Sequence, residues 1–240
     1  SKQSGTNLLS FESTYSALER HSPDVVINCA AHVGSVHYGM ERPATLFHEN
    51  MTMVLNIFKA VKEFDSQIKM INLISNCVYP SQADTQVETE LWDGSPHHSA
   101  LPYASTRRMI LIMAESYFQE NSIRSKNIIL PGIFGPGNHT DIERVHALDG
   151  IIIRMLKAKK AKESEFEIWG TGKPIREWCY IDDLVNVLSK SLSSEFSHSP
   201  LNLANGRGYS IAETAEITKE VISYPGKLKF NTNYEDGAPI

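Results

Sequence analysis

Three short apolar runs, separated by longer amphipathic stretches, constrain the fold of this chain more than any other feature. The runs are DVVINCA at 24–30, IKMINLIS at 68–75 and KNIIL at 126–130. Each is nearly continuous in apolar residues, which is typical of parallel strands that are covered on both faces. Because such strands alternate here with helical patterns, the sequence predicts an α/β fold built on a parallel sheet.

The helical patterns predict helices over 11–21, 50–64 and 102–121, with a polar loop at 80–100 and a Pro/Gly turn at 131–138. Near residue 135 the regular alternation of strand and helix patterns changes, so we expect a second lobe that the chain enters and leaves more than once. The elements predicted after this point, in either lobe, are a basic helix within 139–163, strands at 165–169, 177–181, 201–204 and 227–231, and helices over 182–192 and from Ser210.

Composition excludes several classes of protein. The net charge of −5 and pI near 6.0 give no electrostatic reason to expect nucleic acid or an anionic membrane as a partner. The basic run Lys157–Lys162 is expected to be a solvated helix face. Cys29, Cys77 and Cys179 lie far apart with no CxxC, which argues against a disulfide framework or a metal site. With no apolar stretch of roughly 20 residues and a polar beginning, we expect a cytoplasmic protein.

Ligands of doubly wound sheets lie beyond the carboxyl ends of the strands, which places candidate residues at three positions. These are 30–34 (AAHVG), 75–77 (SNC) and 131–133 (PGI). Small residues at such ends let a flat ring lie against the backbone, although tight packing alone also explains Ala30 and Ala31.

The stretch LPYASTRR at 101–108 places Tyr103 one helical turn before Arg107, just after a strand that ends in Ser75. A serine hydroxyl can hold a carbonyl oxygen while a tyrosine donates a proton to that oxygen during reduction. We expect the pKa of this phenol to lie well below its usual value of about 10, lowered by the cation. A bare tyrosine–arginine pair is also common in surface packing.

A set of segments in order resembles the extended short-chain dehydrogenases/reductases that act on nucleotide sugars, the NAD-dependent epimerase/dehydratase family. The segments are DVVINCAAHVGS, PATLFHENMTMVLNIFKAV, LISNCVYP, LPYASTRR, FGPGN, DIERVHAL and IWGTGKPIREWCYIDDL. The resemblance implies a Rossmann-type sheet, with a dinucleotide-binding domain of residues 1–134 and 174–197 and a small α/β substrate lobe of residues 135–173 and 198–240. It also implies an NADP-dependent enzyme, with NAD as the alternative cofactor, that epimerises and reduces a GDP-linked 4-keto-6-deoxy hexose.

The resemblance assigns catalytic roles by position. Ser75 and Tyr103 would bind and protonate the C4 oxygen, and Arg107 stands where the family has lysine. Cys77 would be the base that removes protons next to the ketone, and His146 the acid that returns them on the other face. A thiolate beside a cation can have its pKa lowered toward neutrality, which suits a base. Taken alone, Cys77 and His146 would more often be packing or surface residues.

The remaining assignments concern the cofactor, the substrate and the assembly. Trp169 would stack on the nucleotide base and Arg176 would bind the diphosphate, while Asp182 and Asp183 are given only a structural role at a helix start. The implied cofactor contacts are Ala30, Ala31, Val33, Asn50, Ile74, Tyr103, Arg107 and Pro131. The implied substrate contacts are Ser75, Asn76, Trp169, Arg176, Lys173 and Asn138. The helices at 50–64 and 103–120 imply a homodimer.

Departures from the family leave alternatives open. No G-x-x-G-x-x-G occurs in these 240 residues, and we expect the strand and glycine loop that carry it to precede Ser1. Arg107 keeps the charge of lysine but not its shape, Pro131-Gly132-Ile133 lacks the family's asparagine, and His32 replaces a basic residue. The alternatives to an epimerase/reductase are an epimerase without reduction and a non-catalytic homologue that binds nucleotide sugars.

Overall fold

The larger sheet of the protein is parallel throughout, as the apolar runs predict. The computed structural model describes residues 5–138, 140–141 and 145–240. The sheet has the strand order β1-β2-β3-β7, in which every neighbouring pair is parallel. Its strands are β1 (Val25–Asn28), β2 (Lys69–Ser75), β3 (Ser125–Leu130) and β7 (Pro200–Asn202).

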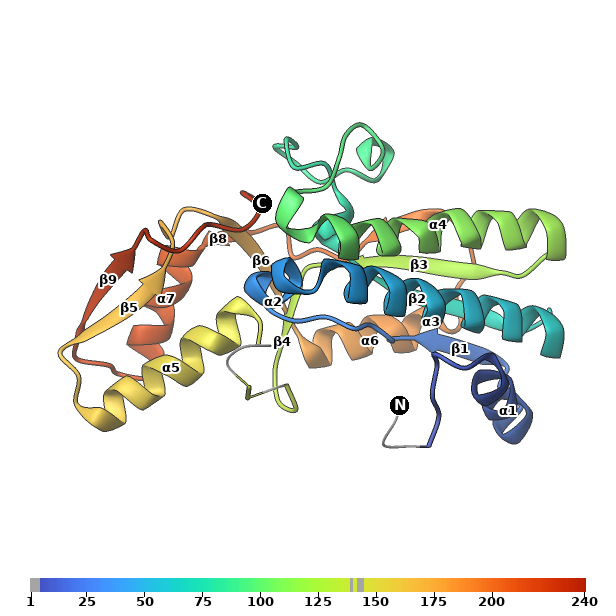
Figure 1. Ribbon diagram of the computed structural model, residues 1–240, viewed down its shortest axis with the longest axis horizontal. Helices are drawn as coiled ribbons and strands as arrows, with labels where there is room; N and C mark the ends of the chain where they lie inside the picture. Colours follow the sequence, from blue (N-terminus) through green and yellow to red (C-terminus); the bar gives the residue numbers. More distant parts are fainter. Residues whose placement is uncertain (1–4, 139, 142–144) are drawn as a thin grey trace.

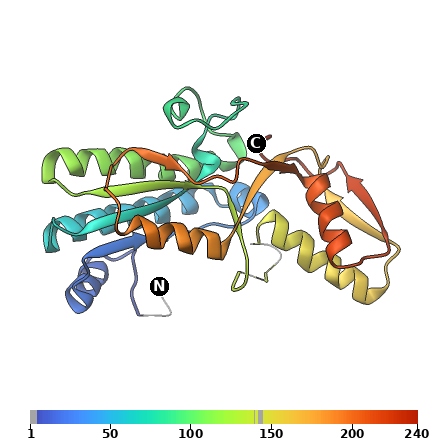
Figure 2. The same cartoon turned by 180° about the vertical axis from the view of Figure 1, so that it is seen from behind.

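Helices cover this sheet on both sides. Three helices share one side in Figure 1, namely α1 (Phe11–His21), α3 (Pro43–Phe64) and α4 (Leu101–Asn121). From behind, α6 (Ile181–Ser191) lies on the opposite side (Figure 2). The main core joins α3 and α4 to β2 and β3, with Phe58, Met70, Ile74 and Ile110 fully buried. The amphipathic helices that the sequence predicts at 11–21 and 102–121 therefore exist and bury their apolar faces here.

A ladder of three asparagines crosses the core of the larger sheet. Asn28, Asn72 and Asn127 stand opposite one another in the registers of β1, β2 and β3, and all three are buried. Asn28 Nδ2 donates to Asn72 Oδ1 at 3.3 Å, and Asn72 Nδ2 donates to Asn127 Oδ1 at 2.9 Å. Because a register slip would leave these amides without partners in the interior, the ladder favours one alignment of the strands.

The second part of the chain forms a smaller lobe, at the left of Figure 1. Its core packs Met155, Phe166 and Ala215 between the parallel strands β5 and β9 and two helices. These elements are α5 (Ala147–Ala161), β5 (Glu165–Trp169), α7 (Ile211–Val221) and β9 (Lys227–Asn231). A third sheet, β4-β6-β8, consists of β4 (Gly132–Phe134), β6 (Ile175–Tyr180) and β8 (Gly208–Ser210). The domain boundaries given above stay a prediction, and β7, within 198–240, pairs with β3 of the larger sheet.

Some local features differ from the expectation. The helix α3 begins at Pro43 rather than at Asn50, and a short helix α2 (Val36–Glu41) precedes it. Strand β4 and the short 3-10 helices η3 (Glu88–Glu90) and η4 (His98–Ala100) lie in segments expected to be turns or loops. Strand β8 and the 3-10 helix η2 (Asn76–Val78) lie where neither kind of element was predicted. The strand β1 is an edge of the described sheet and Ile27 is 41% exposed, so the expected burial on both faces is wrong here. No described helix has the length and apolar character needed to cross a membrane.

Candidate active site

The end of β2 carries the first group of candidate residues. Ser75 closes the strand and caps η2, and its hydroxyl accepts a hydrogen bond of 3.4 Å from the Cys77 backbone N–H. The next residue, Val78, is fully buried, which holds this turn against the core. Ser75 and Cys77 therefore lie just beyond the carboxyl end of an internal strand, where ligands bind in sheets of this kind.

The first turns of α4 place Tyr103 and Arg107 beside that turn. Pro102 lies in the first turn, where a missing backbone N–H costs nothing. The guanidinium carbon of Arg107 is 5.3 Å from the centre of the Tyr103 ring. Arg107 is only 1% exposed, and its Nη1 and Nη2 donate to Ala30 O at 3.1 Å and Asn50 Oδ1 at 3.0 Å. Its Nε is buried without an acceptor among the described residues.

Asn50 connects Arg107 to the loop after β1. Its Oδ1 also accepts from the His32 backbone N–H at 3.0 Å, and its Nδ2 donates to His32 O at 2.8 Å and Leu46 O at 2.7 Å. The His32 ring contacts Glu49 Oε2 and Tyr38 Oη, each at 2.8 Å. Sequence reasoning flagged His32 only as a departure and missed Glu49 and Tyr38, because their pairing depends on how α2 and α3 fold back.

The pKa values of Cys77 and Tyr103, the two candidate proton-transfer groups, are raised, whereas the sequence led us to expect lowered values. Burial raises the pKa of the Cys77 thiol, although the Ser75 hydrogen bond and the charges of Arg107 and Arg108 oppose this rise. Burial raises the pKa of Tyr103 to about 12, and Arg107 opposes it. The cause is the cost of moving a thiolate or phenolate out of water, which exceeds the attraction of a nearby cation. A Tyr103 hydroxyl that keeps its proton at neutral pH is suited to donate it.

Two buried cations stand at this site without a carboxylate. Arg107 donates to Ala30 O and Asn50 Oδ1, and the neighbouring Arg108 donates only to backbone carbonyls. None of the ion pairs among the described residues includes either arginine. Their positive charge is therefore not neutralised, and it favours a thiolate, a phenolate or an enolate formed beside it.

His146 lies in another part of the fold from Cys77. It occupies the N-cap position of α5 in the smaller lobe and is exposed. Burial raises the pKa of Asp149, and the Asn138 hydrogen bond and the charge of His146 oppose this rise. Asn138 Nδ2 donates to Asp149 Oδ2, so these two candidates share one neighbourhood. Residues 139 and 142–144 between them lie outside the described residues. The role of His146 opposite Cys77 stays a prediction.

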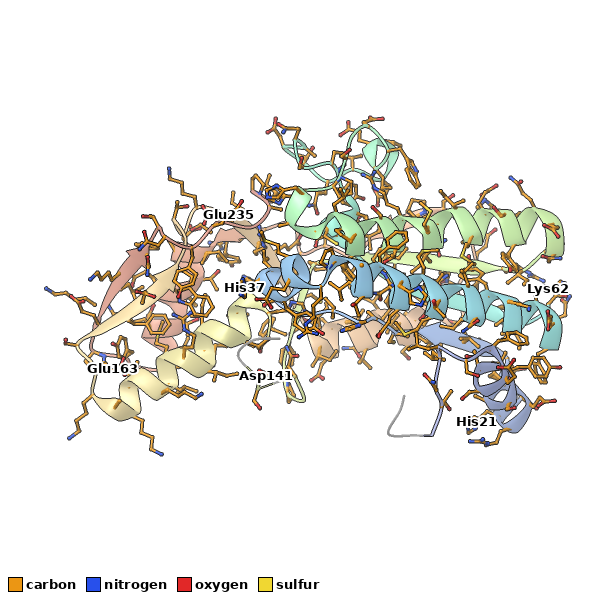
Figure 3. The ribbon with its side chains drawn as sticks, viewed as in Figure 1. His21, His37, Lys62, Asp141, Glu163 and Glu235 are labelled. Atoms are coloured by element: carbon orange, nitrogen blue, oxygen red, sulfur yellow. The ribbon has the colours of Figure 1, made fainter. Side chains whose placement is uncertain are left out.

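Trp169 and Arg176, the candidates for binding the nucleotide, contact Tyr234 and Ala238 near the C-terminal end of this sequence. The Tyr234 ring is stacked on Trp169, with centroids 4.9 Å apart, and the Arg154 guanidinium is 4.1 Å from the same indole. Arg176 Nη2 donates to Ala238 O at 2.7 Å. Asp236 accepts from the backbone and side chain of Thr171, two residues before the exposed Lys173. Figure 3 labels Glu235 of this terminal segment, between the smaller lobe and the start of α4.

A pocket lies at the carboxyl ends of β2, β3 and β7. Its wall includes the candidates Asn76 and Pro131. Asn76 Nδ2 donates to Gln86 Oε1 at 3.1 Å. A Cβ on Gly132 would lie 2.6 Å from the Trp178 ring, so this ring occupies the space beside the position that lacks the family's asparagine. The other residues of the wall are Gln86, Ile129, Leu130, Glu177, Asn202, Leu203 and Ala204.

Three of the residues expected to bind the cofactor, Ala30, Asn50 and Tyr103, contact Arg107. Of the others, Ile74 is fully buried, and Ala31 and Val33 continue the loop toward α2. The orphaned Nε of Arg107 is a donor that a ribose hydroxyl would satisfy, so Arg107 fits the ribose of a nicotinamide cofactor. Among the described residues, no group of three or more His, Cys, Asp or Glu side chains is arranged to hold a metal ion.

Comparison with known proteins decides the family. A sequence profile described as the NAD dependent epimerase/dehydratase family matches residues 5–204. The chain belongs to this family. Membership confirms the expected Rossmann-type fold and the enzyme class, an NAD(P)-dependent epimerase or reductase of the extended short-chain type. The aligned GDP-L-fucose synthase of Dictyostelium discoideum is 32% identical over 239 residues, which is 98% of this chain and 74% of that protein.

Solved structures of the same family share this architecture. A GDP-L-fucose synthetase from Naegleria fowleri superposes with a TM-score of 0.86 at 27% identity, over 97% of this chain and 72% of that one. A second structure of that synthetase, bound to NADP, has a TM-score of 0.84 at 25% identity over the same shares of the two chains. The fold expected from the motifs is thereby confirmed, as is the expected likeness to epimerase/reductases of GDP-linked sugars.

Proposed function

We propose that this protein is an NADP-dependent epimerase/reductase of a GDP-linked 4-keto-6-deoxy hexose. The observation that carries the proposal is the gathering of Ser75, Cys77, Tyr103 and Arg107 at the carboxyl end of β2 and the start of α4. Cys77 and Tyr103 are close enough for a charge on Cys77 to raise the pKa of Tyr103. The relatives named GDP-L-fucose synthase, and the one bound to NADP, support the substrate and cofactor.

Epimerisation requires a base beside a ketone and donors on its oxygen. The Cys77 thiolate takes the proton from the carbon next to C4, and the electrons of the C–H bond move to the ketone oxygen. Ser75 and Tyr103 donate hydrogen bonds to that enolate oxygen, and the charge of Arg107 stabilises it. His146 returns a proton on the opposite face of the ring, which inverts the carbon.

Reduction uses the same oxygen and one more proton. A bound nicotinamide cofactor supplies the hydride that C4 receives. Tyr103 donates its hydroxyl proton to the C4 oxygen, and Arg107, 5.3 Å from the ring, stabilises the phenolate that remains. Because burial keeps Tyr103 protonated at neutral pH, the donor is ready before the reaction begins.

A second candidate function, epimerisation without reduction, is favoured by one observation. Arg107 Nη1 and Nη2 each donate to a protein acceptor, Ala30 O and Asn50 Oδ1, so the guanidinium is held within the protein. The residues proposed for proton exchange, Cys77 and His146, do not depend on this feature. Solvent exchange without cofactor oxidation distinguishes this function from the first.

The proposed assembly is a homodimer formed through α3 and α4, which pack side by side (Figure 1). Phe47 and Leu55 on α3 and Ile112 and Phe118 on α4 are large apolar side chains exposed to solvent. We infer from these exposed apolar side chains that the two helices take part in the interface. Sedimentation velocity should show a dimer, and Leu55→Asp with Ile112→Asp should shift it to a monomer. We also place the reaction in the cytoplasm, in keeping with three free cysteines.

To test the proposed reaction, the protein is incubated with a GDP-4-keto-6-deoxy hexose in deuterated water, with and without NADPH. We expect deuterium at the carbons beside C4 in both cases and NADPH oxidation in the first. Cys77→Ser should abolish exchange, and Tyr103→Phe should slow NADPH oxidation by about a hundredfold or more. Exchange without oxidation would support the epimerase alone. Absence of both would contradict either enzymatic function for this sugar.

A further inference from the structure

Arg108 is a buried cation that the proposed reaction does not use. It is 9% exposed, and its contacts join α4 to two separate segments. Its Nε donates to Val78 O at 2.7 Å, and its Nη2 donates to Leu91 O at 2.7 Å and Gly94 O at 2.8 Å. The guanidinium carbon also lies 5.4 Å from the centre of the Trp92 ring.

The first of these contacts holds the turn that carries Cys77. Val78 follows Cys77 in η2, so a bond to its carbonyl restrains the Val78–Tyr79 peptide, at the end of the turn that carries the thiol. The turn is also held by bonds of 3.1 Å from the Tyr79 N–H to Asn76 O and from Asn76 Nδ2 to Gln86 Oε1, and by the long bond of 3.4 Å from the Cys77 N–H to Ser75 Oγ. The 2.7 Å bond from Arg108 is the shortest of these and the charge-assisted one, so it makes a strong contribution to the position of the turn.

The two neighbouring arginines of α4 reach different sides of the site. Consecutive helical residues point about 100° apart, so Arg107 reaches Ala30 and Asn50 while Arg108 reaches Val78 and Leu91. Both charges act on Cys77, and both oppose the rise of its pKa. Among the described side chains, Ser75, Arg107 and Arg108 oppose the rise that burial causes, and a charge on Cys77 in turn acts on Tyr103.

The partners of Arg108 are carbonyl oxygens, which bind the guanidinium but carry no net charge. A buried cation without a carboxylate costs free energy, since its desolvation is not offset by an opposite charge. A neutral side chain in this place would avoid that cost, and a cation bonded to an acidic side chain would lose most of its effect on its neighbours. Only an unneutralised cation both holds the turn and attracts an anion at Cys77.

We propose that Arg108 is a positioning residue for Cys77: its charged hydrogen bond to Val78 O fixes the turn that presents the thiol. The inference rests on the proposed role of Cys77 as the base of epimerisation. It gives the second arginine of the TRR sequence a function distinct from that of Arg107, which lies against Tyr103.

The test uses Arg108→Gln and Arg108→Lys in a Cys29→Ser background, because Cys29 is an exposed thiol. Lys126→Gln is the matched control, since Lys126 also donates to a backbone carbonyl, Ser191 O, away from Cys77. The first readout is alkylation of Cys77 by iodoacetamide at a series of pH values, followed on the Cys77 peptide by mass spectrometry. The second is the rate of solvent deuterium exchange into the keto sugar as its concentration is varied.

In Arg108→Gln we expect the alkylation curve to move to higher pH and kcat for exchange to fall about tenfold or more, with KM unchanged. In Arg108→Lys, which keeps the charge but not the fork of donors, the curve should return toward the parent while kcat stays several-fold low. Lys126→Gln should match the parent in both readouts. An unchanged alkylation curve and unchanged kcat in a folded Arg108→Gln would overturn the proposal.

If Arg108→Gln does not fold, Arg108→Lys becomes the test of the positioning role. A kcat for exchange equal to that of the parent in Arg108→Lys would then overturn this role. If Cys77→Ser still exchanges deuterium at the parental rate, the proposed function of Cys77 fails. The alkylation curve then still reports whether Arg108 acts on the thiol, so the two failures are distinguishable.

Discussion

Arg107 Nη2 donates a hydrogen bond of 3.0 Å to Asn50 Oδ1 and so ties the start of α4 to α3. Asn50 has no capacity left for another partner, because its Oδ1 accepts two bonds and its Nδ2 donates two. The planar fork of Arg107 therefore completes a closed network around the loop after β1. A lysine would present a point charge there instead of a fork.

Arg107→Lys should therefore affect stability more than chemistry. One ammonium cannot reproduce both bonds of the fork, so we expect the free energy of unfolding to fall by about 1–3 kcal/mol. The positive charge stays near Tyr103, so NADPH oxidation should remain within about tenfold of the parent. Urea denaturation and the reductase assay measure the two effects. Arg107→Gln, which loses the charge, is the control and should lose reduction as well.

Raising the pH should destabilise the protein through Tyr103. Its pKa is about 12 in the folded protein and about 10 in an unfolded chain, so between these values only the unfolded state loses the proton. Stability contributed by this group is complete below pH 10 and is lost as the pH rises toward 12, on the order of 2 kcal/mol. Urea denaturation at pH 8–11 measures the slope, to which Tyr79 also contributes.

Tyr103→Phe is the comparison that isolates this effect. Because phenylalanine does not ionise, the variant should lose less stability than the parent over the same pH range, while the contribution of Tyr79 stays. Equal slopes for the two proteins would mean that Tyr103 ionises as readily in the folded state as in the unfolded one.

Asn72→Ala should be strongly destabilising although it lies away from the reacting atoms. The change leaves Asn28 Nδ2 and Asn127 Oδ1 without their partners inside the sheet. We expect the free energy of unfolding to fall by about 2–4 kcal/mol. Asn233→Ala is a suitable control because Asn233 is an exposed asparagine. A cost below about 1 kcal/mol for Asn72→Ala would show that water replaces the ladder.

Tyr234→Ala should uncover Trp169 and raise the affinity for GDP. The Tyr234 ring is stacked on the indole, which is 44% exposed, so a base that stacks there has to displace it. A stacked aromatic pair is worth about 0.5–1.5 kcal/mol, which converts to an affinity gain of roughly two- to tenfold. Titration of GDP by calorimetry measures it. Weaker binding in the variant would instead make Tyr234 part of the surface that receives the base.

Local patterns in the sequence determined most of the elements. The helix at 11–21 and the strands at 165–169 and 227–231 have the bounds that the patterns predict, and Asp182 and Asp183 lie in the first turn of α6. The capping box that begins α7 at Ser210 was also readable, because a serine three residues before a glutamate satisfies the helix start locally. These features depend on neighbours along the chain.

The sequence by itself determined the parallel α/β class, the family, and which residue types lie at the ends of the strands. Only the tertiary structure decided which charges face each other. It joined Arg107 to Asn50, turned Arg108 toward Val78, placed Tyr234 on Trp169, and reversed the expected pKa shifts of Cys77 and Tyr103. The physical reason is that periodicity records local burial, whereas desolvation and hydrogen bonding depend on which distant segments exclude water from the same atoms.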